Sequence, residues 1–430
     1  MVNCKTLLIA QGLYFAPEPR PDAIGYEDDP VTGARCHYNR EAHADRCQQV
    51  FEVLAASWDA QTAAGWVEPF PDDGEGGSPG LDIYISKDAG GGAYVDSTYV
   101  DADPDDGRQG AWSHMVIDPG IDPDEYPDYV AHEFNHVLQF ATDFREPTLP
   151  PWEGAATRAE ELTYPGNGSG PTVAPDYNLT PWVGFLLDGW WLWDEYEIWS
   201  YYEYGSVLFF DDLREEHGIT AADYWTAMIN AQKKNEPDSI DALEDLLGDA
   251  RQHWIEFGIR RARMGTDDAP AWAQEMYPDA VLGTEGSLSI GDSIEPEYGV
   301  FDWGFVAVDI DEDGTLIVDG EAGVEWAVVS VDTETELISP AEVAAGDRIL
   351  VFAFGPPDFD GDDTPQQRAL KLTLGVAGAD SGWDTGDSDT RPVRPGDEDP
   401  GGCGCASGLE PGAAWLLTLL VFARRSRRSG

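Results

Sequence analysis

Basic residues are scarce in this chain of 430 residues: 25 Lys and Arg stand against 82 Asp and Glu, which gives a formal net charge of −57. Proteins that bind nucleic acid through a basic face need cationic side chains to displace counterions, so the composition excludes that class. It also argues against electrostatic docking on anionic lipid. The excess of carboxylates predicts a solvated acidic surface, with attraction of cationic substrates as the alternative.

Cysteine is rare as well. The chain has five cysteines, and no cluster of Cys and His has the spacing of a zinc finger. Cys36 and Cys47 lie eleven residues apart. They can pair in an oxidising compartment or remain two buried thiols, and their spacing leaves both possibilities open.

A clear secretory signal is missing from the start of the chain. The apolar run Leu7–Ala10 is shorter than the roughly 7–15 residues that an export signal needs. At the other end, residues 377–402 are rich in Gly, Asp and Pro and predict an extended acidic linker. Residues 403–430 then contain Cys403 and Cys405, an apolar segment at 412–423 and a cluster of arginines.

This C-terminal order resembles the MYXO-CTERM sorting tails of myxobacterial surface proteins. The apolar segment is shorter than the ~20 residues of a membrane-spanning helix, and the arginines that follow it favour the cytoplasmic side. The resemblance implies export and retention at the cell surface or outer membrane, through this segment before or after its processing. An ordinary membrane anchor is the alternative. Both conflict with the missing signal, so we expect the native start to differ from Met1.

The body of the chain is rich in aromatic residues, with 16 Trp, 17 Tyr and 16 Phe, which separates it from disordered acidic proteins. After a segment of unclear order at 1–35, residues 36–284 mix helical and strand periodicity and predict an α+β domain. We expect its helices at 41–64, 124–143, 204–216, 221–232 and 239–263, and its strands at 81–85, 93–95 and 114–117. Residues 285–376 predict a β-sandwich, with short strands at 305–308, 315–318, 326–331, 348–354 and 369–374.

The motif that carries chemistry is His-Glu-x-x-His at residues 132–136. Two histidines at i and i+4 of a helix lie one turn apart, so His132 and His136 can ligate one metal ion. Glu133 projects beside them, where it can act as a general base toward water. At about 100° per residue the apolar side chains of this helix form one stripe and the histidines lie opposite, which predicts that they face a cleft.

A metal site of this kind needs a third protein ligand, and the segment Pro151–Glu161 offers one. The pair of motifs resembles the gluzincin metallopeptidases, and is most similar to a metallopeptidase group of myxobacterial surface proteins. The resemblance implies a zincin-like domain over residues 36–284, with a mixed sheet, an active-site helix and a helical C-terminal part. It also implies Zn²⁺ on His132, His136 and Glu153. Trp152 directly before Glu153, and Arg158 where an aromatic residue is common, depart from the family pattern.

Glu160 and Asp143 are the alternative third ligands, since both fall in or near the two predicted helices. No third histidine follows at the metzincin spacing, which disfavours a site of three histidines. Tyr204 opens a later helix and could donate a hydrogen bond to an oxyanion, or simply pack in the core. The strand Ala93–Thr98 is the candidate edge for an extended substrate.

Two further features are weaker. The aromatic residues between Trp182 and Tyr204 predict core packing, with a substrate groove as the alternative. The run Asp101–Gly107, with aspartates at 101, 103, 105 and 106, is a candidate calcium loop, so Ca²⁺ is a possible second metal.

These observations predict a zinc-dependent peptidase, exported and anchored at the cell surface, with protein or peptide substrates. The rival is a non-catalytic surface-binding or adhesion protein on a zincin-like scaffold. A pure binder has no physical need for a base beside the metal, so Glu133 favours the enzyme. The sequence carries no indication of oligomeric state.

Overall fold

The computed structural model describes residues 19–377, apart from residues 73, 101–109, 145, 147, 188–200, 232–238 and 358–364. All of the described residues belong to one compact unit. The predicted sorting segment, the predicted linker beyond its first residue, the candidate calcium loop and most of the aromatic residues between 182 and 204 lie outside the described residues. Within the described ranges, no helix has the length and apolar character needed to cross a membrane.

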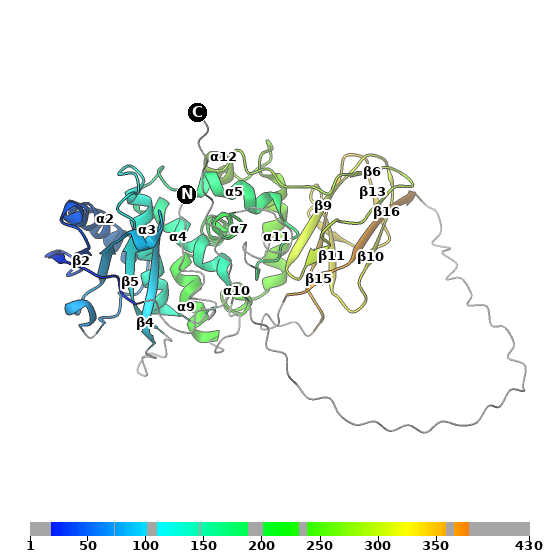
Figure 1. Ribbon diagram of the computed structural model, residues 1–430. Coiled ribbons are helices and arrows are strands. Elements are labelled where there is room, and N and C mark those ends of the chain that lie inside the picture. Colours follow the sequence, from blue (N-terminus) through cyan, green and yellow to red (C-terminus); the bar gives the residue numbers. More distant parts are fainter. Residues whose placement is uncertain are drawn as a thin grey trace, which may run out of the picture. The chain divides into compact units, whose positions relative to one another are not determined.

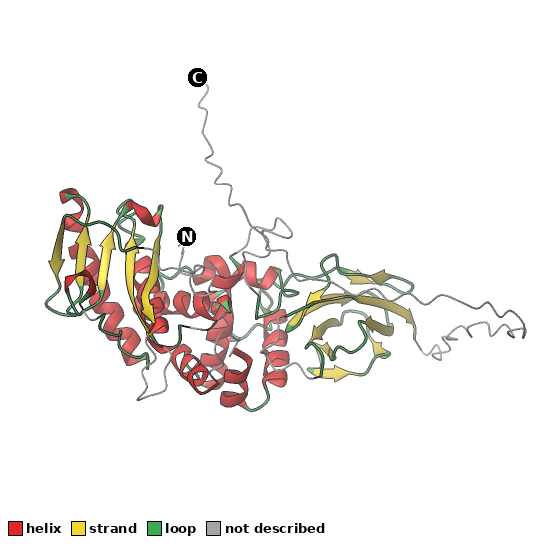
Figure 2. Cartoon of the chain, turned by 60° about the horizontal axis from the view of Figure 1, so that its bottom comes forward, coloured by secondary structure: helices red, strands yellow, loops and turns green. Residues whose placement is uncertain are grey.

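A five-stranded mixed sheet begins the fold (Figures 1 and 2). Its strand order is β1-β2-β3-β5-β4: the three central strands run parallel, and the edge strands β1 and β4 are antiparallel to their neighbours. The strands are β1 (Gly25–Asp28), β2 (Arg35–Tyr38), β3 (Asp82–Ile85), β4 (Ala93–Val100) and β5 (Ala111–Ile117). The strand predicted at 93–95 is thus only the start of a longer strand, β4, which continues to Val100.

One face of this sheet packs against two helices, α2 (Ala44–Ala63) and α3 (Tyr126–Thr142). Alternate residues of the strands point toward them, as the pleat requires. Ile83 and Met115 from the sheet share a buried core with Leu54 of α2 and Phe134 of α3. The predicted helices at 41–64 and 124–143 are confirmed.

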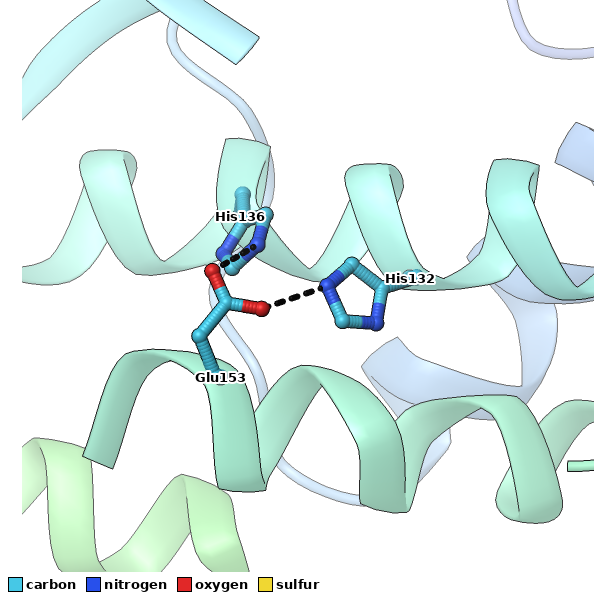
Figure 3. Close-up of side chains that lie close together, drawn as sticks. All are labelled: His132, His136 and Glu153. Atoms are coloured by element: carbon cyan, nitrogen blue, oxygen red, sulfur yellow. Dashed lines mark hydrogen bonds and ion pairs between the residues drawn. The ribbon is translucent and has the colours of Figure 1, made fainter. Parts of the chain in front are cut away.

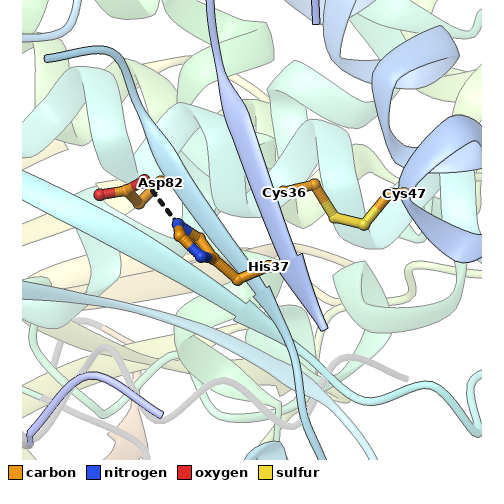
Figure 4. Close-up of a disulfide and its surroundings, with 4 residues drawn as sticks. All are labelled: Cys36, His37, Cys47 and Asp82. Atoms are coloured by element: carbon orange, nitrogen blue, oxygen red, sulfur yellow. Dashed lines mark hydrogen bonds and ion pairs between the residues drawn. A yellow bond between two sulfur atoms is a disulfide. The ribbon is translucent and has the colours of Figure 1, made fainter. Parts of the chain in front are cut away.

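A disulfide between Cys36 and Cys47 joins β2 to the first turn of α2 (Figure 4). Both cysteines are fully buried and their Cα atoms lie 5.5 Å apart. Of the two possibilities that their spacing left open, the structure has the bonded pair.

A helical region follows α3. Its helices are α4 (Leu149–Thr163), α5 (Gly170–Leu179), α7 (Tyr202–Gly205), α8 (Val207–His217), α9 (Ala221–Ala231), α10 (Ser239–Leu247), α11 (Ala250–Arg263) and α12 (Ala271–Met276). The single helix expected at 239–263 is wrong. Gly248 has a φ of 85°, which ends α10 in the left-handed region, and the Asp249 side chain accepts a hydrogen bond from Gln252 N to begin α11.

Residues beyond 285 are all-β. One sheet has the order β13-β10-β16-β7, a second has β12-β11-β14-β9-β6, and β15 pairs with β8. The longer strands are β9 (Gly304–Ile310), β10 (Gly314–Gly320), β11 (Trp326–Ser330), β14 (Arg348–Ala353) and β16 (Leu370–Val376). The shorter ones are β6 (Ser287–Leu288), β7 (Ser293–Ile294), β8 (Val300–Phe301), β12 (Thr335–Leu337), β13 (Ala341–Val343) and β15 (Gln367–Arg368). All five strands predicted from the sequence are present.

Helix α11 contacts the all-β part directly. The fully buried guanidinium of Arg261 lies 5.0 Å from the centre of the Phe305 ring, and Arg348 Nη1 donates to the carbonyl of Ala262 over 3.2 Å. Residues from both parts belong to one continuous hydrophobic core. The fold is therefore mixed α+β, and the helical region packs between the first, five-stranded sheet and the all-β part.

Candidate metal centre

Helix α3 carries His132, Glu133 and His136 through the middle of the fold. Pro127 lies in the first turn of α3, where a backbone N–H would have no partner within the helix, so the lack of an N–H on proline costs nothing there. The apolar stripe predicted from the sequence is buried against the sheet and α2. The opposite face, which we expected to open to a cleft, is also covered: both histidines and Glu133 are fully buried. Helix α4 packs against this face of α3, and the predicted cleft stays a prediction.

Glu153 of α4 lies between the two imidazoles (Figure 3). Its Oε2 is 3.0 Å from His132 Nε2, and its Oε1 is 3.4 Å from His136 Nε2. One ligand atom from each of these three residues lies within 4.8 Å of the others. Among the described residues, this is the only group of three or more His, Cys, Asp or Glu side chains so arranged.

The three residues fit a divalent cation. His136 Nε2 and Glu153 Oε1 are buried, and neither makes a hydrogen bond within the described part of the chain. These two atoms form an ion pair with each other at 3.4 Å without hydrogen-bond geometry, and a bound cation would give both of them a stronger partner. Two imidazole nitrogens with one carboxylate oxygen form a donor set that suits Zn²⁺.

The other nitrogen of each imidazole is held by a second side chain. His132 Nδ1 lies 2.8 Å from Glu160 Oε1, and His136 Nδ1 lies 2.6 Å from Gln139 Oε1. Glu160 also accepts from Ser169 N over 2.6 Å, and Gln139 donates to the Trp152 carbonyl over 2.9 Å. These contacts keep both Nε2 atoms turned toward Glu153, which is how histidine ligands are oriented in metal proteins.

The two alternative third ligands have other positions. Glu160 contacts the Nδ1 side of His132, away from the Nε2 atoms, so it holds the ring rather than closing the triad. Asp143 follows the last residue of α3 and is not part of the group. The sequence motifs did not identify the roles of Glu160 and Gln139. Their spacings, seven residues after Glu153 and three after His136, place each on the matching helix face and could have indicated them.

Charge coupling within the cluster is strong. Burial alone would lower the pKa of His132, but its hydrogen bonds to Glu153 and Glu160 outweigh burial and raise the pKa to about 10. Burial alone would raise the pKa of Glu153, yet the charge on His136 and the hydrogen bond to His132 lower it to about 2. A metal ion would replace the proton that these groups share, so its binding would compete with protonation of His132.

Aromatic side chains surround the imidazoles. The ring of Tyr204 stacks on His132 at a centroid distance of 5.7 Å, and the Trp152 ring lies 6.1 Å from His136. Tyr204 thus adjoins the centre, while its predicted role at an oxyanion stays a prediction. Trp182 and Tyr202 are buried, so these described members of the aromatic run pack in the core.

Gly154, directly after Glu153, allows α4 to approach the junction of α7 and α8. A Cβ at this position would lie 2.9 Å from the backbone carbon of Ser206 and 3.1 Å from the Phe210 ring. The Ser206 hydroxyl also donates to the carbonyl of Pro150 on α4 over 2.6 Å. The small residue beside the ligand therefore sets how closely α4, and with it Glu153, is held.

Comparison with known proteins adds no relative: the chain matches no protein-family profile, no curated protein and no solved structure. The gluzincin and sorting-tail resemblances therefore stay predictions from the sequence.

Proposed function

We propose that this protein is a zinc-dependent peptidase with His132, His136 and Glu153 as its metal ligands and a zincin-like catalytic domain. The observation that carries the proposal is the convergence of three ligand atoms within 4.8 Å, with Glu133 on the same helix as both histidines. A metal site with a carboxylate beside it, not among its ligands, matches the needs of hydrolysis.

Each residue of the site would have its own role in hydrolysis. Bound zinc would supply a Lewis acid that lowers the pKa of water and polarises the scissile carbonyl. Glu133 would accept a proton from the attacking water and pass it to the leaving amine. Glu160 and Gln139 would keep the imidazoles oriented, and Tyr204 would donate a hydrogen bond to the developing oxyanion.

Strand β4 suits the binding of an extended substrate. It is the edge of the first sheet beyond β5, and it contacts α3. An edge strand offers unpaired backbone groups to a peptide, which adds as a further strand. We therefore propose protein or peptide chains as substrates.

The disulfide supports export. Disulfides persist in oxidising compartments and are rare in the cytosol, and the Cys36–Cys47 bond joins two elements of the domain core. Together with the C-terminal pattern, this favours a protein held at the cell surface or outer membrane.

One observation favours the rival function, a non-catalytic surface-binding or adhesion protein with a structural metal. The three ligands and Glu133 have no exposed surface. Structural zinc sites are closed, whereas catalytic sites keep a position open to water and substrate. If the rival holds, the metal stabilises the packing of α3 against α4 and takes part in no reaction.

The decisive experiment compares the full chain with its Glu133→Gln and His132→Ala variants. Metal content is measured by plasma mass spectrometry, and hydrolysis with labelled casein. The peptidase predicts one zinc per chain and hydrolysis in the parent, unchanged zinc but no hydrolysis in Glu133→Gln, and loss of both in His132→Ala. Zinc in the parent without hydrolysis would favour the structural metal. Absence of zinc after refolding with zinc would overturn the peptidase and the structural metal, and would favour a surface-binding protein without a metal.

A further inference from the structure

Two of the seven histidines of the chain contact each other where α8 and α11 meet, outside the metal centre. His217 is the last residue of α8, and His253 lies near the start of α11. Their ring centroids are 4.8 Å apart and the ring planes are at 90°. The imidazoles of the proposed centre, His132 and His136, have nearly the same arrangement, at 4.8 Å and 82°. Two imidazoles at this separation can each turn one nitrogen toward a shared metal ion.

Glu256, three residues after His253 on α11, adds a carboxylate beside this pair. Its Oε2 lies 3.7 Å from His253 Nδ1, which is too far for a hydrogen bond. Two ligand atoms of one zinc ion are roughly 3.3–3.5 Å apart, given bond lengths of about 2.0–2.2 Å and a tetrahedral angle. The two atoms therefore already have nearly the spacing of a ligand pair. His253 Nδ1 is also buried without a hydrogen-bond partner in the described part of the chain.

His217 is the third donor, and it is the one that has to move. Unlike the buried triad, these three residues do not yet offer three ligand atoms within 4.8 Å of one another. The His217 side chain is half-buried and makes no hydrogen bond with any described residue, so its ring can turn at small cost. The completed set, two imidazole nitrogens and one carboxylate oxygen, is the donor set of the proposed centre.

The charges around the pair favour a cation. Glu216 and Glu256 both act on the His217 imidazole. Arg260 acts on it as well, but Arg260 Nη2 donates to Asp212 Oδ2 over 2.9 Å, so this positive charge is paired. Two carboxylates then remain beside two imidazoles, and their combined charge attracts a divalent ion.

We propose that His217, His253 and Glu256 form a second metal site, which binds a divalent transition-metal ion such as Zn²⁺ and joins the end of α8 to α11. Imidazole ligands select such ions over Mg²⁺ and Ca²⁺, which take oxygen ligands. The Glu256 side chain is 38% exposed, so the ion exchanges with solvent and is lost on desalting, unlike an ion in the buried triad. The site goes beyond the proposed peptidase and does not depend on it.

The test is equilibrium dialysis of the full chain against micromolar zinc chloride, with excess magnesium chloride to occupy weak carboxylate sites. Plasma mass spectrometry counts the zinc bound by the parent and by His253→Ala. The parent should bind one zinc more than this variant, whatever the buried triad holds, and desalting should remove that zinc. Equal zinc in the two proteins overturns the proposal.

Three further variants separate metal binding from packing. His217→Phe keeps a ring against His253 but offers no nitrogen, so it should lose the exchangeable zinc while the metal-free thermal midpoint stays unchanged. Glu256→Gln keeps the size of the side chain, removes its charge and should weaken zinc binding. His43→Ala removes another half-buried histidine, whose Nδ1 also has no hydrogen-bond partner among the described residues but which lies near Arg40, and should leave binding unchanged. Exchangeable zinc that survives both His217→Phe and Glu256→Gln contradicts the assignment.

Discussion

The imidazole of His132 is held from both of its nitrogens by carboxylates, at 2.8 and 3.0 Å. One of these carboxylates, Glu153, would be a ligand of the proposed metal; the other, Glu160, would make the ring a stronger donor toward that metal. The energetic importance of such outer carboxylates comes from charge as well as from orientation. Substitutions that keep the hydrogen bond but remove the charge can therefore separate the two contributions.

Glu160→Gln is the first of these substitutions. It preserves an acceptor for His132 Nδ1 but removes its negative charge, so zinc affinity should fall about 10- to 100-fold, the usual effect of losing such a partner. Competition with a chromogenic chelator measures the change. Glu161→Gln, on the neighbouring residue that binds Gly166 N, is the matched control and should leave the affinity unchanged. Equal affinities in the two variants would contradict the orienting role of Glu160.

His114 predicts a pH dependence of stability that is independent of the metal. It is fully buried on β5, neither ring nitrogen makes a hydrogen bond in the described structure, and burial lowers its pKa to about 3. The unfolded chain, with a histidine pKa near 6.5, binds the proton more readily. The stability that neutral His114 gives the folded state is therefore complete above about pH 6.5, and it is lost progressively as the pH falls toward 3.

The free energy of unfolding should fall by about 2 kcal/mol between pH 7.5 and pH 5, because each pH unit below the pKa of the unfolded state costs about 1.4 kcal/mol. Urea unfolding at the two pH values measures it, with His114→Leu as the comparison. The variant should lose less stability than the parent by this amount, because it has no histidine to protonate. Parallel pH profiles for the two proteins would show that His114 is protonated in the folded state as well.

At the scale of elements, α4 is the helix on which the centre depends. It presents Glu153 and Glu160 to α3 and, through Gly154, approaches the backbone at the α7–α8 junction. Gly154→Ala should cost about 1–3 kcal/mol, because backbone at Ser206 yields less easily than a flexible side chain. It should also weaken zinc binding by shifting Glu153. Urea unfolding and metal competition measure the two effects, and Glu161→Ala on the same helix is the control.

The sequence predicted elements well where local periodicity decides them. Helices α2 and α3 agree with their predicted ranges to within a few residues, because each has a continuous apolar stripe facing the sheet. Helix α5 was not predicted, since Gly170 and an internal Pro175 disfavour a helix. Close packing against α7 offsets the low helix propensity of α5: a Cβ on Gly205 of α7 would lie 2.6 Å from the carbonyl oxygen of Val173 on α5.

The candidate site divides in the same way. His132, Glu133 and His136 were predictable because helical spacing alone brings them together. The meeting with Glu153 requires α4 to pack on α3, which only the resemblance to a family indicated. The complete burial of the triad could not be predicted, since it depends on how α4 and Tyr204 pack over the histidine face.

For the whole molecule, the dominant property is the net charge of −57. Self-repulsion among so many carboxylates opposes the compact state, and salt screens it over a Debye length of ~10 Å at 0.1 M. The thermal midpoint should therefore rise as sodium chloride increases from about 0.02 to 1 M, a range over which screening becomes nearly complete. Differential scanning fluorimetry measures it. A midpoint that falls with sodium chloride would mean that attractive pairs, such as Arg260 with Asp212, outweigh the repulsion.

The complete burial of the triad has a kinetic consequence. A metal ion held by three fully buried ligands would leave only through a local opening of the side chains around them, so that opening would limit the rate of its loss. Above a modest concentration, a chelator would no longer accelerate the loss, in the same way that amide hydrogens exchange only from an open state. A metal acquired during folding would then be lost only as fast as the site opens, even where free zinc is scarce.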